Sequence, residues 1–124
     1  MNDNAKALIA ALRSGEYKQG KGALARRYVD GWHYCVLGVG CEVYIRAGNP
    51  LEARSLPSGR RLLRLYGGSP GRLPKAVARW LGLDRWLASN LSNLNDRGLT
   101  FAEIADIIEA RPEEWFVPQE VANG

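Results

Sequence analysis

Helical spacing of apolar residues near both ends of the chain is the feature that most constrains its fold. Residues 5–12 place apolar side chains at the i, i+3, i+4 and i+7 positions of one helix face. Residues 99–110 repeat this period, and Thr100 and Glu103 form a capping box that starts the second helix. The pattern between them lacks the regular alternation of strands and helices that a parallel α/β sheet requires.

The segment after the first helix predicts a β-hairpin followed by a helix. Asp30-Gly31 is a turn signal, and it joins predicted strands at residues 23–28 and 32–35. The next helix is predicted over residues 35–47 and contains two glycines. Because each glycine costs about 1 kcal/mol in a helix interior, we expect tight packing, or a close backbone approach by protein or ligand, at these glycines.

The second half of the chain predicts a long loop and three helices. Residues 48–74, rich in Gly, Pro, Ser and Arg, are expected to form a loop with one short strand at 60–66. Helices at residues 74–83 and 84–96 precede the helix at 99–110. The fold class predicted is α+β, with several short helices around a small antiparallel sheet or hairpin.

The chain of 124 residues is long enough for one domain. We assign this globular domain to residues 1–112 and a C-terminal tail to 113–124, which Trp115 and Phe116 anchor before it frays. No apolar run reaches the length of about 20 residues that a membrane span needs, and no signal peptide is recognised. A cytoplasmic protein with free thiols and no membrane partner is the expectation.

The stretch "GEYKQGKG" at residues 15–22 imitates a phosphate-binding P-loop. It departs from that motif because a helix precedes it where a strand is needed, and because Gly22 replaces the hydroxyl residue that holds Mg²⁺. We therefore interpret it as an irregular turn into the hairpin. Lys21, followed by Arg26 and Arg27, either lies on a plain surface loop or contacts a phosphate.

Charge is distributed unevenly along the chain. Residues 1–79 contain 14 Lys and Arg but five Asp and Glu, whereas residues 80–124 contain three and eight. Seven basic residues and no acidic one fall between Arg54 and Arg79. Such a chain presents a solvated basic face, binds an anion there, or docks its acidic part onto its basic part.

Aromatic residues alternate with cations in the first half, which is the combination that nucleobases and phosphates require. We expect cations to contact phosphate, an aromatic ring to stack on a base, and the "ND" turn before the last helix to read ribose or base edges. For that turn, a purely structural role is the alternative. The predicted ligand contacts are Gln19, Gly20, Lys21, Gly22, Arg26, Arg27, Tyr28, Trp32, Asn95 and Asp96.

Catalytic, metal and helix-turn-helix interpretations have weaker support. His33 is the single histidine, and its pairing with Cys35 as a nucleophile lacks an orienting acid in the sequence. The acidic residues show no metal-ligand spacing, and Cys35 and Cys41 show neither metal nor redox spacing. Residues 100–115 resemble the first helix of a helix-turn-helix, but acidic residues follow where DNA contacts are needed. We expect no catalytic residues, metal or cofactor.

Five blocks in order, "LRSGEYKQGKGAL", "YCVLGVGCEVY", "LP", "WLGL" and "LNDRGLTFAEIADIIE", resemble a group of small proteins found widely in tailed-phage and actinobacterial genomes. Gly40, where a bulkier apolar residue is usual, and the arginine-rich loop depart from that pattern. By analogy with other small phage proteins, the resemblance implies a counter-defence protein that sequesters a cyclic nucleotide or ADP-ribose-type signal. It also implies a homo-oligomer in the host cytoplasm with pockets at subunit boundaries.

The function predicted is therefore non-enzymatic binding of an anionic, nucleotide-like small molecule. One alternative is a nucleic-acid or protein interaction module that uses the Arg54–Arg79 stretch. The other is a small hydrolase or transferase, which would release a chemically altered ligand.

Overall fold

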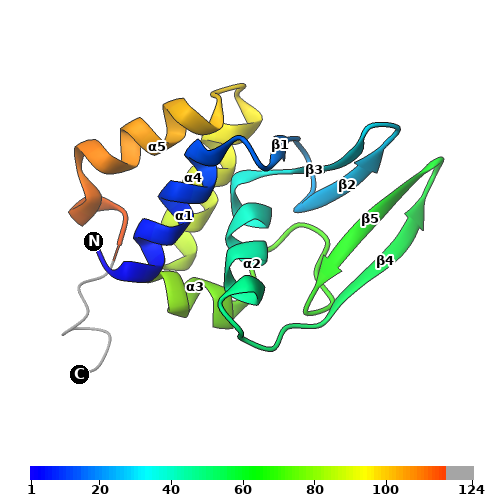
Figure 1. Cartoon of the computed structure of the whole chain (residues 1–124), viewed down its shortest axis with the longest axis horizontal. Coiled ribbons are helices and arrows are strands. Elements are labelled where there is room, and N and C mark those ends of the chain that lie inside the picture. The colour runs from blue at the N-terminus through cyan, green and yellow to red at the C-terminus, as the bar shows by residue number, and fades with distance from the viewer. Residues whose placement is uncertain (117–124) are drawn as a thin grey trace.

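Helices and hairpins occupy opposite ends of the molecule, with α2 between them (Figure 1). The computed structural model describes residues 1–116. In chain order the elements are α1 (Asp3–Ser14), β1 (Lys18–Gln19), β2 (Ala25–Tyr28), β3 (Gly31–Tyr34), α2 (Val36–Arg46), β4 (Ala53–Ser58), β5 (Arg61–Tyr66), α3 (Lys75–Leu81), α4 (Arg85–Asp96), α5 (Phe101–Ala110) and the 3-10 helix η1 (Pro112–Glu114). The predicted α+β class is confirmed.

Helix α2 is the centre of the core, and α1, α3 and α4 all pack against it. Most of its residues are buried, which fits a helix that is apolar on nearly every side. A Cβ on Gly38 would lie 1.9 Å from the backbone oxygen of Leu24, so the chain passes this helix at a distance that only glycine permits. A Cβ added at Gly40 would lie 3.2 Å from a methyl carbon of Leu81. The expected close packing at both glycines is confirmed, and the neighbour in each case is protein.

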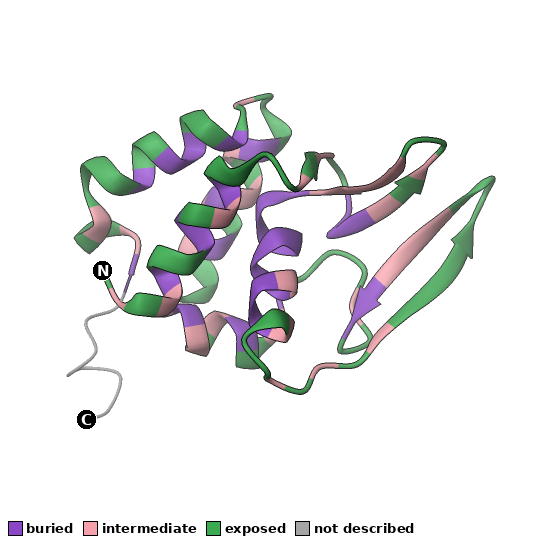
Figure 2. Ribbon diagram, in the orientation of Figure 1, coloured by how far each residue is buried: buried purple, intermediate pink, exposed green. Residues whose placement is uncertain are grey.

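The outer helices form as their periodicity and caps predict. Asn2 caps α1 by accepting from the backbone N–H of Ala5, and the Thr100–Glu103 capping box starts α5. The buried stripes of α1 and α5 face inward, while their outer sides are exposed (Figure 2). Arg13 of α1 joins the two helices on the surface by donating to Asp106 and Glu109 of α5.

The sheet has five strands in the order β1-β3-β2-β5-β4, and it is mixed. The expected β2–β3 hairpin forms, with Arg26 opposite His33 and Arg27 opposite Trp32. However, β1 pairs with β3 in parallel, so the prediction of a purely antiparallel sheet is wrong. This pair arises because the chain after α1 runs alongside the far strand of the hairpin before turning into β2.

The long loop predicted for residues 48–74 is partly wrong, because it contains a complete second hairpin. The predicted strand at 60–66 is β5, and it pairs along its whole length with β4. β4 is an edge strand with five of its six residues exposed, so it carries no apolar alternation. It also contains Pro57, a residue that sheets tolerate at an edge.

The last described residues pack onto the helices. Phe116 is buried in the core and Trp115 is half-buried against it, so the expected anchoring is confirmed. The predicted fraying of the tail concerns residues 117–124, which lie outside the described part of the chain. Within residues 1–116, no helix combines the length and apolar character needed to cross a bilayer.

Candidate functional site

Two predicted ligand contacts, Gln19 and Asn95, hold the fold together. Asn95 is fully buried in α4. Its Oδ1 accepts from the Gln19 side chain (3.0 Å) and from the Val36 backbone N–H (3.2 Å), and its Nδ2 donates to the Gly20 carbonyl (2.7 Å). The side-chain oxygen of Gln19, Oε1, in turn accepts from the backbone N–H of Phe101, the first residue of α5 (2.9 Å). Both side-chain amides therefore join β1 to the starts of α2 and α5.

The loop that contains Gly20, Lys21 and Gly22 connects β1 to β2 and opens no helix, so it is not a P-loop. Gly20 donates its N–H to the Tyr34 carbonyl (2.8 Å), and a Cβ on it would come within 2.9 Å of the His33 Cβ. Gly22 has a φ of 80°, which favours glycine in this turn. The Lys21 ammonium extends toward the α4–α5 turn, where a Cβ added at Gly98 would lie 3.7 Å from its Nζ.

The predicted cations do not converge on one hollow. Adjacent strand residues point to opposite faces, so Arg26 shares a face with His33 whereas Arg27 shares the other with Trp32. Lys21 lies at the helical end of the sheet, beside the turn after α4. Of these three, Arg27 lines a hollow, together with Tyr28, at the tip of the hairpin.

The remaining predicted contacts are also dispersed. The Tyr28 ring contacts the His33 ring and the Arg61 guanidinium, which lies 4.1 Å from its centroid. Trp32 is half-buried, with the Arg64 guanidinium 5.8 Å from its ring centroid. Asp96 is exposed at the end of α4. The ten predicted residues are thus divided among β1 with the loop after it, the β2–β3 hairpin and the end of α4.

His33 and Cys35 do not form a nucleophilic pair. The His33 Nε2 lies 2.8 Å from Asp30 Oδ1, and this hydrogen bond is the main reason that the pKa of Asp30 is lowered. Burial raises the pKa of both the Cys35 and Cys41 thiols, which disfavours the reactive thiolate. Among residues 1–116, no three His, Cys, Asp or Glu side chains gather as a metal site would require.

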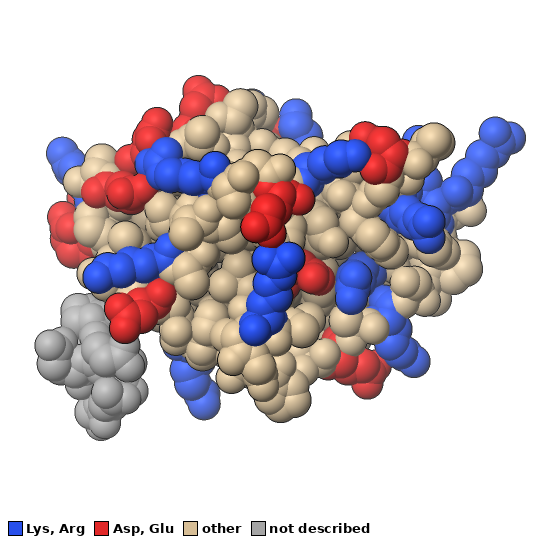
Figure 3. Space-filling model, viewed as in Figure 1, with Lys and Arg blue, Asp and Glu red and all other residues tan. Residues whose placement is uncertain are grey.

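Within residues 1–116, no ion pair joins the Arg54–Arg79 stretch to the acidic residues that follow it. Figure 3 shows acidic side chains at the α5 end with basic ones among them, and basic side chains that project at the hairpin end beside a few acidic ones. Within Arg54–Arg79, Arg54 pairs with Glu52 and Arg64 lies near Glu42. The other five cations form no ion pair with any described residue: Arg60, Arg61, Arg72, Lys75 and Arg79.

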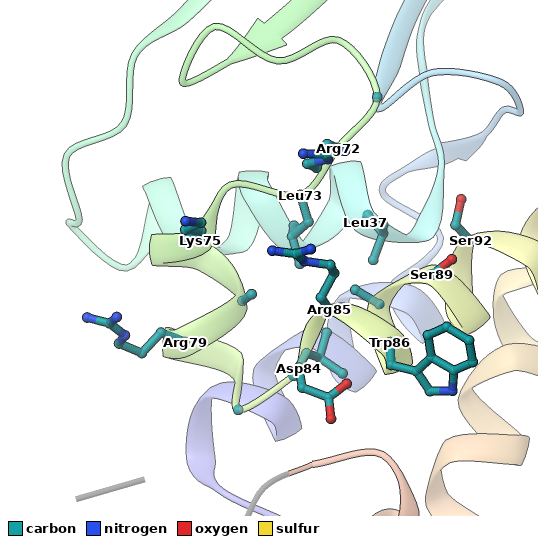
Figure 4. A pocket seen from close by; sticks show the side chains of 15 residues that line it. Leu37, Arg72, Leu73, Lys75, Arg79, Asp84, Arg85, Trp86, Ser89 and Ser92 are labelled. Atoms are coloured by element: carbon teal, nitrogen blue, oxygen red, sulfur yellow. The ribbon is translucent and has the colours of Figure 1, made fainter.

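Three of these cations line a groove of about 810 Å³ between α3 and α4, which we call the α3–α4 groove. Arg72 comes from the preceding loop, Lys75 and Arg79 from α3, and a fourth cation, Arg85, from the start of α4. Arg85 extends across the centre of the groove, below Arg72 and Lys75, while Arg79 points away to one side (Figure 4). No ion pair within residues 1–116 neutralises any of the four.

The rest of the groove offers an aromatic surface, hydroxyls and an apolar base. Trp86 is 77% exposed, unlike most large apolar residues in the described part of the chain. Ser89 lies on the next turn of α4 on the same side (Figure 4). The acidic residue of the lining, Asp84, accepts from the Leu87 N–H (2.8 Å) and caps α4. Its charge therefore stabilises the start of the helix.

Sequence reasoning missed Arg85 and Trp86, although a signal was present. In α4 the apolar stripe runs through Leu87, Leu91 and Leu94, and Trp86 lies off that stripe. A tryptophan on the polar side of an amphipathic helix, next to an arginine, indicates an exposed aromatic surface beside a positive charge.

Comparisons with known proteins identify a family but no characterised relative. No curated protein and no solved structure matches the chain. Residues 1–112 match the family described as "Domain of unknown function (DUF8296)". Since that match covers all but the last residues of the chain, the protein belongs to the DUF8296 family.

Proposed function

We propose that this protein binds an anionic, nucleotide-like ligand in the α3–α4 groove and sequesters it unchanged. The observation that carries the proposal is the set of four cations without acidic partners, Arg72, Lys75, Arg79 and Arg85, around one groove that also presents Trp86. The predicted class of function is therefore retained, and its site is moved from the hairpin and the α4–α5 turn to α3 and α4.

The size and chemistry of the groove fit a nucleotide better than a simple anion. A volume of about 810 Å³ lies in the range of 300–1,000 Å³ that small-molecule sites occupy. Several separated cations suit a ligand with more than one phosphate, and an exposed indole offers a stacking surface for a base. The resemblance to phage proteins makes cyclic nucleotides and ADP-ribose derivatives in the host cytoplasm the first ligands to test.

The test is a thermal-shift screen with cyclic di- and trinucleotides and cyclic ADP-ribose isomers, using uncharged nucleosides as the negative control. A ligand at a hundredfold excess over its dissociation constant adds about 2.7 kcal/mol to the free energy of unfolding. For a domain of this size, that increase corresponds to a rise in Tm of roughly 10 °C. No shift with any of these anions at millimolar concentration would contradict the proposal.

Substitutions in the groove test whether the ligand binds there. Arg85→Gln and Trp86→Ala remove exposed side chains. Without ligand, we therefore expect each variant to have the Tm of the wild type, and with ligand we expect it to lose most of the shift in Tm. Arg97→Gln removes the same charge from an exposed position outside the groove and is the matched control. Equal losses in Arg85→Gln and Arg97→Gln would indicate a general charge effect. Mass spectrometry of the released ligand distinguishes sequestration, which returns it intact, from hydrolysis or transfer.

A further inference from the structure

The two hairpin tips form a second basic hollow, which we call the tip cleft. β2 and β5 are antiparallel neighbours, so the β2–β3 turn and the β4–β5 turn project at the same end of the sheet (Figure 1). Between them lies a hollow of about 340 Å³. Its lining residues are Arg27, Tyr28, Val29, Arg60, Arg61 and Leu62.

The tip cleft has three guanidinium groups and no carboxylate in its lining. The acid nearest along the chain is Asp30, and its carboxylate is bound by two residues outside the lining, His33 and Lys18. Asp30 Oδ1 lies 2.8 Å from the His33 Nε2, and Oδ2 lies 3.3 Å from the Lys18 ammonium. Asp30 therefore pairs with residues of β3 and β1, and within residues 1–116 it forms no ion pair with the three arginines of the cleft.

The geometry of the cleft favours phosphate over a base. Arg61 lies over the Tyr28 ring, with its guanidinium carbon 4.1 Å from the centroid, and His33 packs against the same ring. The ring therefore holds a guanidinium in place and is less available to stack on a base. A fixed, planar guanidinium donates two parallel hydrogen bonds to one phosphate group.

We propose that the tip cleft binds the phosphodiester backbone of duplex DNA without reading its sequence. A two-stranded β-ribbon fits the major groove of B-form DNA, whereas the major groove of A-form RNA is too narrow for one. Arginines at two neighbouring tips then contact phosphates beside the groove. An anionic membrane is disfavoured because Val29 is the one fully exposed apolar side chain in the lining of the cleft, whereas Tyr28 and Leu62 are half-buried and less available as anchors.

The number of arginines in the cleft predicts how steeply the affinity for DNA falls with salt. Each phosphate neutralised on B-DNA contributes about −0.9 to the slope of log K against log salt, so three arginines give about −2.7. Affinity should then fall roughly 40-fold between about 50 mM and 200 mM salt. The assay is fluorescence anisotropy of a short labelled duplex titrated with the full chain at several salt concentrations.

The decisive variant is the double substitution Arg60→Gln with Arg61→Gln, which should bring the slope to about −0.9. The double substitution Arg85→Gln with Arg97→Gln removes the same two charges, one from the α3–α4 groove and one from the residue after α4, and it should bind DNA like the wild type. Circular dichroism and the Tm verify that every variant is folded. No binding at low salt, an unchanged slope in the double tip variant, or an equal loss in the control would each overturn the proposal.

Two further experiments complete the test. The first identifies which polyanion the tip cleft prefers, and the second shows whether the tip cleft and the α3–α4 groove bind independently. Duplex RNA and vesicles containing phosphatidylserine should bind more weakly than DNA, and a preference for either one would refute the DNA assignment. The double tip variant should keep any nucleotide-induced thermal shift, because that shift depends on Arg85 and Trp86. Failure of nucleotide binding therefore leaves the DNA result intact, and failure of DNA binding leaves the nucleotide result intact.

Discussion

Replacing Asn95 with alanine should destabilise the protein by about 3–5 kcal/mol. The substitution removes three hydrogen bonds, to Gln19, Val36 and Gly20. Gln19 keeps its bond to the Leu99 carbonyl, but the Val36 N–H and the Gly20 carbonyl lose the side-chain partner that the structure provides. An unpaired buried backbone group costs about 1–3 kcal/mol, with the upper part of that range for Val36, which is fully buried, and the lower part for half-buried Gly20. The small cavity left by the amide adds to this cost.

Urea denaturation followed by circular dichroism measures the effect directly. With an m-value of about 2 kcal/mol/M, a loss of 4 kcal/mol moves the midpoint down by about 2 M. The m-value itself should not change, because the surface exposed on unfolding is nearly the same.

Asn93→Ala is the matched control, since Asn93 is exposed two residues earlier in the same helix. Both substitutions gain the same helix propensity, about 0.6 kcal/mol in favour of alanine. The control should therefore be neutral or slightly stabilised. If the two variants differ by less than about 1 kcal/mol, the network does not have the stabilising role that its geometry indicates.

Three other predictions concern packing, thiol reactivity and pH. Gly38→Ala should destabilise the fold by at least about 3 kcal/mol in urea, because its methyl would overlap a backbone oxygen that cannot move aside. Gly40→Ala meets only the end of a flexible side chain and gains helix propensity, so a comparable loss there would refute this account. Cys35 and Cys41 should react with a thiol reagent only after denaturant is added, because burial raises the pKa of both; rapid labelling of the native protein would contradict this. The pKa of Asp30 is lowered in the folded state, so its stabilising contribution is present above about pH 4 and is lost as the pH falls through the folded-state pKa. The difference in Tm between the wild type and Asp30→Asn should shrink in that acidic range, and a difference that grows there would show the opposite sign.

The elements that sequence reasoning placed correctly are those whose signals are local. Residues 5–12 and 101–108 show the apolar period and the caps that α1 and α5 use. Strand β4, over Ala53–Ser58, was missed because an exposed edge strand has no buried face to impose alternation. The parallel pairing of Lys18–Gln19 with β3 depends on where the chain travels after α1, and a two-residue strand carries no signal for that.

The predicted ligand contacts failed to converge for a related physical reason. A polar residue near a turn has the same local sequence whether its side chain faces solvent or satisfies buried backbone groups. Gln19 and Asn95 take the second course, because the N-termini of α5 and α2 present N–H groups that need acceptors. By contrast, Arg72 and Arg85 come from segments separated by a whole helix, and only the packing of α3 against α2 and α4 against α2 places them around one groove.

Asn95→Ala also separates the two interpretations of this residue, because α4 carries Asn95 near one end and Arg85 and Trp86 at the other. If Asn95 reads ribose or base edges, the variant loses ligand binding even where it is fully folded. If the amide is structural, the variant unfolds at lower urea but, in the absence of urea, keeps the same nucleotide-induced shift as the wild type. The two outcomes require the same protein and two measurements, the free energy of unfolding and the shift in Tm with ligand. A stable variant that no longer responds to ligand would return the site to the α4–α5 turn. A destabilised variant that still responds would place binding at the opposite end of the helix, where four cations remain without acidic partners in the described chain.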